Sequence, residues 1–175
     1  MQANFSSSRI LLPVKRWFIF LSLFVALILN FLPTSAWHWM PDWVAMTLIF
    51  WSIRESRHIG MRSAFLLGLI MDVANASLLG QHALAYVAAS YLASSLSRRI
   101  LWFPLWQQAL HALPLLLIVQ VVQIVVRILP ETGVELPGIS YFLGPFLGMI
   151  IWPLLTFILL LPQYQPVEQD DNRPI

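Results

Sequence analysis

Long apolar stretches separated by short polar segments run through most of the chain. Six of them approach the length of about 20 residues that an α-helix needs to cross a bilayer. They are Trp17–Leu32, Trp39–Ile53, Ser63–Leu79, His82–Leu96, Trp106–Leu129 and Tyr141–Leu161. The second and fourth are short, so we expect them to extend into the interface, to tilt little, or to lie where the bilayer is thinned. The pattern predicts an all-α integral membrane protein, a compact bundle of six transmembrane helices.

Composition supports this class. The 175 residues are 59% hydrophobic and only 10% charged, whereas soluble domains carry about 25% charged residues. The absence of cysteine excludes disulfides and thiolate metal sites, and a net charge of +2 is too small to indicate nucleic-acid binding. We expect a single six-span membrane domain over residues 1–162, a disordered cytoplasmic tail over 163–175, and no cofactor or metal.

The first apolar run resembles a secretory signal followed by the small residues Thr34-Ser35-Ala36. It is longer than the apolar core of about 7–15 residues that such signals have, so we expect it to be retained as the first span.

Positive charge gives the orientation. Nine of the ten basic residues fall on one side of the six-span order: Arg9, Lys15, Arg16, Arg54, Arg57, Arg62, Arg98, Arg99 and Arg173. The opposite loops, Pro33–His38, Gly80–Gln81 and Pro130–Ser140, contain no lysine or arginine. Because basic loops stay in the cytoplasm, both termini are expected there.

Asp72 lies deep inside the third apolar stretch, where an ionisable group near the bilayer middle is costly and suggests function. Ala64, Gly68, Asp72, Asn75 and Leu79 follow helical spacing, so they are expected to share one face. Three interpretations stay open for that face: an internal hydrogen bond or ion pair that orders the bundle, a ligand or proton site, and a polar contact with another membrane protein.

The fifth stretch carries a second polar face. Gln120, Gln123 and Arg127 stand at i, i+3 and i+7 in its outer half. Arg127 is expected either to extend its guanidinium toward the interface or to pair with a carboxylate. The candidate partners are Asp72, Glu131, Glu135 or a carboxylate of another protein.

Small residues mark two faces for close helix packing. Ala85, Ala89 and Ala93 repeat every four residues in the fourth stretch, and Gly144 and Gly148 form a G-x-x-x-G pattern in the sixth. Helices in lipid associate where small side chains let backbones approach. The glycine pair is consistent with internal packing or with a homodimer contact.

Motifs for enzyme chemistry are missing. The sequence has no H-E-x-x-H, no G-x-S-x-G and no phosphate-binding glycine loop. No pair of carboxylates is expected at similar depth, so we predict a non-enzymatic protein.

An ordered run through the third and fourth stretches resembles the MreD family of bacterial rod shape-determining proteins. It comprises Gly68-Leu-Ile-Met-Asp72, Leu78-Leu-Gly80, Ala83-Leu84 and Tyr86, preceded by Pro41-Asp-Trp43. Gly68, Asp72, Leu79 and Gly80 correspond to the family run. Gly80 is expected to supply a positive φ in the external turn.

The resemblance implies a subunit of the cell-elongation (rod) complex in the bacterial inner membrane, which maintains rod shape and organises peptidoglycan synthesis. The implied partners are an MreC-like bitopic membrane protein and, beyond it, RodA, a penicillin-binding transpeptidase and MreB filaments. It also implies a fold similar to the substrate-binding subunits of energy-coupling-factor vitamin transporters. A small-solute or vitamin-binding carrier subunit is therefore the alternative. A carrier needs a cavity with several convergent polar groups, and few such groups are expected outside the third and fifth spans.

Overall fold

A computed structural model describes residues 14–32, 40–129 and 138–163. Within these ranges the chain forms six α-helices and two short 3-10 helices, with no strand. They are α1 (Arg16–Phe31), α2 (Trp43–Arg54), α3 (Met61–Ala74), α4 (Gln81–Leu101), α5 (Leu105–Ile128), η1 (Ile139–Phe142), α6 (Leu143–Leu160) and η2 (Leu161–Gln163). The prediction of an all-helical chain with six helices is confirmed.

The shortest helix, α2, lies at the centre of the bundle. It packs against α1, α4, α5 and α6, and ten of its twelve residues are buried. A helix that is apolar all round is stable only where every face meets protein or lipid. Two polar side chains of α2 are paired inside the bundle. The Trp51 indole N–H donates to Ser22 Oγ at 2.8 Å, and the Ser52 and Ser90 hydroxyls lie 2.9 Å apart.

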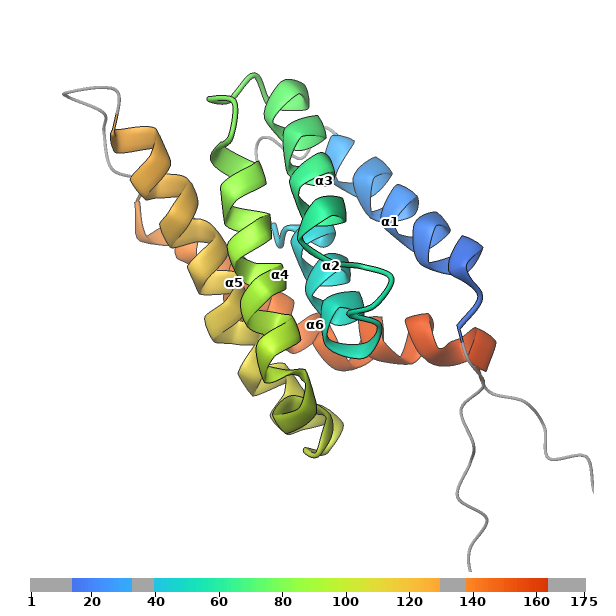
Figure 1. Cartoon of the computed structure of the whole chain (residues 1–175). Coiled ribbons are helices and arrows are strands. Elements are labelled where there is room, and N and C mark those ends of the chain that lie inside the picture. The colour runs from blue at the N-terminus through green and yellow to red at the C-terminus, as the bar shows by residue number, and fades with distance from the viewer. Residues whose placement is uncertain (1–13, 33–39, 130–137, 164–175) are drawn as a thin grey trace, which may run out of the picture.

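Figure 1 shows α3, α4 and α5 next to one another, with α4 in the middle. The small-residue face of α4, formed by Ala85, Ala89 and Ala93, is buried. Side chains of this size let the α4 backbone approach α2, α3 and α5, which all pack against it.

The outside of the bundle is apolar. Exposed side chains include Trp17, Phe24, Leu66 and Ile150, each 60% or more exposed. Two helical stretches, Leu105–Ile128 and Ile139–Gln163, are long and apolar enough to cross a membrane, and α1 and α2 are shorter apolar helices. A largely apolar outer surface on helices of this kind is the arrangement of a membrane protein.

Three predicted span boundaries are wrong. The second helix begins at Trp43 instead of Trp39, with Asp42 as its N-cap. The third stretch leaves the helix at Ala74 instead of Leu79, because residues 75–80 form a turn with positive φ at Ala76 (49°) and Gly80 (100°). Asp72 therefore lies in the last turn of α3 and not near the middle of a span. The fourth helix extends to Leu101 instead of Leu96.

The longer fourth helix has a simple cause. Ser94 and Ser95 donate to the Tyr91 carbonyl within the helix, at 2.8 Å each, so polar residues lower its hydropathy without ending it. The predicted cytoplasmic tail lies outside the described residues apart from Gln163, which ends η2.

Candidate functional site

The Asp72 carboxylate links the end of α3 to the start of α4. Its Oδ1 accepts from the backbone N–H of His82 at 2.7 Å and from Ser77 Oγ at 3.0 Å, and it lies 2.8 Å from His82 Nδ1. Its Oδ2 accepts from the backbone N–H of Gly80 at 2.8 Å. Gly80 is the N-cap of α4 and has no side chain to cap it. Asp72 therefore performs this role from the preceding helix, with a negative charge at the positive end of the α4 dipole.

Glycines on either side of Asp72 make this contact possible. A methyl group added at Gly68 would lie 2.7 Å from the carbonyl carbon of His82 and closer still to the Cα of Ala83. Only glycine lets the backbones of α3 and α4 come this close. Gly80 has the predicted positive φ, which turns the chain back so that its N–H faces Asp72.

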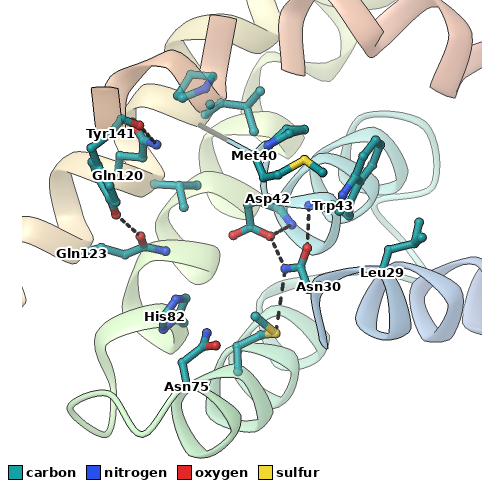
Figure 2. Close-up of a pocket in the computed structure, with 17 residues that line it drawn as sticks. Leu29, Asn30, Met40, Asp42, Trp43, Asn75, His82, Gln120, Gln123 and Tyr141 are labelled. Atoms are coloured by element: carbon teal, nitrogen blue, oxygen red, sulfur yellow. Dashed lines mark hydrogen bonds between the residues drawn. The ribbon is translucent and has the colours of Figure 1, made fainter. Parts of the chain in front are cut away.

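Asp42 makes an equivalent cluster at the start of α2. Its Oδ1 accepts from the backbone N–H of Ala45 at 2.9 Å and from Asn30 Nδ2 at 2.9 Å, and its Oδ2 accepts from Tyr86 Oη at 2.7 Å. Asn30 Oδ1 in turn accepts from the backbone N–H of Trp43 at 3.0 Å, as Figure 2 shows. Asp42 thus caps α2 and joins it to α1 and α4.

The two glutamines of α5 hold the segment that leads into α6. Gln120 Nε2 donates to the Tyr141 carbonyl at 2.9 Å, and the Tyr141 hydroxyl donates to Gln123 Oε1 at 2.8 Å. Gln120 Oε1 is buried and has no hydrogen-bond partner. Buried acceptors of this kind are uncommon and call for an explanation.

These clusters surround a cavity of about 240 Å³, to which all six α-helices contribute lining residues. We call it the polar cavity. Its polar lining groups are Asn30, Asp42, Asn75, His82, Gln120 and Gln123. In Figure 2, Asp42 lies between Asn30 on one side and Gln120 and Gln123 on the other, with His82 and Asn75 below. The expectation that few polar groups would converge is wrong, because helix ends from across the chain meet here.

Arg127 does not join these clusters. It is exposed near the end of α5, and the Asp72 carboxylate faces His82 Nδ1 at 2.8 Å instead. The prediction that Arg127 could pair with Asp72 is therefore wrong. The other named partners, Glu131 and Glu135, lie outside the described residues. Asn75 is exposed at the end of α3 and lines the cavity without bonding to Asp72.

The glycine pair of α6 packs inside the chain. Methyl groups added at Gly144 and Gly148 would lie 3.0 Å from the Met40 carbonyl oxygen and 2.9 Å from Leu116 Cδ1. The two glycines thus let α6 approach the start of α2 and the middle of α5.

Sequence reasoning missed Asp42 and Tyr86 as site residues, and it wrongly expected no two carboxylates at similar depth. Tyr86 bonds Asp42, while His82, one turn earlier on α4, bonds Asp72. One helical turn rises about 5.4 Å, so both carboxylates lie at the same end of the bundle. The available signal for Asp42 was its position just before an apolar run, where an N-cap is expected.

The arrangement is built of hydrogen bonds between helix ends. The described part of the chain contains no group of three or more histidine, aspartate or glutamate side chains that could hold a metal ion. Each carboxylate accepts from several donors, which suits a structural role.

Comparison with known proteins gives two matches. A model of the family described as rod shape-determining protein MreD matches residues 8–163. The rod shape-determining protein MreD of Haemophilus influenzae is 27% identical over 149 residues, which cover 83% of this chain and 91% of that protein. No solved structure matches the chain. Residues 8–163, which the family model matches, include both carboxylate clusters and the polar cavity.

Proposed function

This chain belongs to the MreD family of rod shape-determining proteins, and we propose that it is a non-enzymatic membrane subunit of the bacterial cell-elongation complex. The family match over residues 8–163 is the observation that carries the proposal. The structure is consistent with it, because the hydrogen bonds of the Asp42 and Asp72 clusters connect one helix to another.

The subunit is proposed to bind an MreC-like bitopic membrane protein and, through the complex, to help organise peptidoglycan synthesis. Every described element is a helix or a short connection between helices. Contacts made by this part of the chain with a partner are therefore made by its helices or by the short segments that join them. RodA, a penicillin-binding transpeptidase and MreB complete the proposed assembly.

The test is co-purification. A tagged copy of the full chain, extracted in a mild detergent, should retain an MreC-like protein in roughly equal amount. An unrelated tagged six-span protein extracted in the same way is the control. Recovery of the MreC-like protein with both baits, or with neither, would refute the proposed partnership.

We further propose that all six helices lie in the inner membrane with both termini in the cytoplasm. Arg16 and Arg57 line a common cavity at one end of the bundle. Asp42 and Asp72 lie where α2 begins and α3 ends, which is the opposite end of those helices. This agrees with the positive-inside rule. A periplasm-active reporter fused after Glu131 should work and one fused after Gln169 should not; the reverse result would refute this orientation.

A small-solute or vitamin-binding carrier is the second candidate, and the polar cavity is the observation that favours it. Its volume of about 240 Å³ falls below the range of about 300–1,000 Å³ typical of small-molecule sites. Equilibrium binding of a vitamin panel to the purified protein decides this. Micromolar binding of any vitamin would favour the carrier, and no binding would remove it.

A further inference from the structure

We propose that the polar cavity binds an organic cation, an alkylammonium or guanidinium group. This inference goes beyond the shape role and does not depend on it. Three features of the cavity carry it: the carboxylate of Asp42, the imidazole of His82, and a mixed aromatic and aliphatic wall.

The first feature is a charge without a counter-charge. Among the described residues that line the cavity, Asp42 is the one acidic residue, and none is a lysine or an arginine. The described hydrogen bonds to its carboxylate come from neutral donors: an amide side chain, a backbone N–H and a phenol. A carboxylate in a partly dehydrated site is stabilised strongly by a cation, and Oδ2 retains room to accept another hydrogen bond.

The second feature is a further acceptor. His82 Nδ1 lies 2.8 Å from the Asp72 carboxylate, which favours the proton on Nδ1. In neutral imidazole, Nε2 is then an acceptor as well. A ligand that donates several hydrogen bonds can bond both to Asp42 Oδ2 and to His82 Nε2.

The third feature is the wall around them. Trp43 and Tyr141 line the cavity together with Leu29, Leu116 and Val119. Aromatic faces attract cations, and aliphatic side chains accommodate an alkyl stem. An anion would be repelled by Asp42, and a metal ion would lack ligands among the described residues. A lysine-like or arginine-like group fits the charge, the acceptors and the size.

The test uses the full purified chain and four small probes of similar length: n-butylammonium, n-butylguanidinium, n-butanol and butyrate. Saturation-transfer NMR and calorimetry measure their binding. The two cations should bind at least tenfold more tightly than n-butanol, and butyrate should not bind. Equal binding of butanol, or tighter binding of butyrate, would overturn the proposal.

Two variants and one control locate the site. Asp42→Asn keeps an oxygen that can cap α2 and should abolish the preference for cations. Asn75→Asp adds a carboxylate at an exposed position on the cavity and should tighten cation binding several-fold. Glu55→Gln, at the other end of α2, should change nothing. A cation preference that survives in folded Asp42→Asn would refute the site; if that variant does not fold, an unchanged affinity in Asn75→Asp would refute it instead.

The cation can come from a side chain of another protein or from a free amine. Repeating the n-butylammonium titration on the complex with an MreC-like protein separates the two sources. Loss of binding in the complex assigns the cavity to a lysine or arginine of the partner, and unchanged binding assigns it to a free amine. Because the probes are first measured on the isolated chain, failure there leaves the proposed shape role standing.

Discussion

The Asp72 carboxylate in the last turn of α3 accepts the backbone N–H of His82 in the first turn of α4, at 2.7 Å. The end of one helix therefore caps the beginning of the next. Asp72 is almost fully buried, and its two oxygens receive hydrogen bonds from backbone and side-chain donors. It acts as a polar anchor that fixes how α3 and α4 pack.

Replacing Asp72 by asparagine should destabilise the protein, although the shape of the side chain is nearly unchanged. Both carboxylate oxygens accept hydrogen bonds, so an amide NH₂ would face a donor on one side. We expect a loss of about 2–3 kcal/mol in unfolding free energy, measured by thermal or chemical unfolding in detergent. Ser77→Ala is the control and should cost about 1 kcal/mol, because it removes one donor only. An Asp72→Asn variant as stable as the original chain would contradict the capping role.

Replacing Gly68 by alanine should separate α3 from α4. The added methyl group would overlap the backbone of His82 and Ala83, which cannot rotate away as a side chain could. The expected cost is about 3 kcal/mol, at the upper end for overpacking, visible as a lower unfolding temperature. Gly60→Ala is the matched control, because its nearest neighbour would be the Ser56 carbonyl at 3.9 Å. Equal stability of the two variants would show that α3 and α4 are not in close contact at Gly68.

A substitution at Gly80 tests the backbone conformation of the turn separately from side-chain packing. Its φ is 100°, and an added methyl group would meet no atom within 4 Å. Gly80→Ala should therefore cost only the strain of a left-handed conformation, about 1–2 kcal/mol. Gly138→Ala, where φ is −63°, should be neutral in the same unfolding experiment. No difference between these variants would place Gly80 in an ordinary backbone conformation.

Tyr86 tests the second carboxylate cluster. Its buried hydroxyl donates to Asp42 Oδ2 at 2.7 Å, and Tyr86→Phe removes that donor from a carboxylate that caps α2. We expect a loss of about 2 kcal/mol in unfolding free energy. Tyr91→Phe, on an exposed position of α4, should change stability by less than about 0.5 kcal/mol. A neutral Tyr86→Phe would mean that Asp42 does not need this contact.

Hydropathy was sufficient to predict six helices, and the glycine in a short turn was sufficient to predict the positive φ of Gly80. Hydropathy misplaced the end of α3, because Leu78 and Leu79 continue the apolar run after the helix has ended at Ala74. Apolar composition reports the surroundings of a segment, whereas the helix ends where the backbone changes conformation. Here Ala76 has a positive φ, and the backbone N–H of Ser77 donates to the Asp72 carbonyl at 3.0 Å.

The polar cavity could not be predicted from spacing. Asn30, Asp42 and Tyr86 belong to three different helices, and only the packing of α1, α2 and α4 brings them into hydrogen-bonding contact. Gln120 and Gln123 were recognised as a polar face of one helix. Their partner Tyr141, on η1, follows from how the chain folds back against α5.

Depletion of this protein in a rod-shaped bacterial host tests the central claim most directly. The measurement is cell length and width by microscopy at unchanged nutrient supply, with re-expression of the original chain as the control. Cells should become round and swollen on depletion and should regain their rod shape on re-expression. Rods of unchanged width after complete depletion would contradict the proposed role in cell elongation.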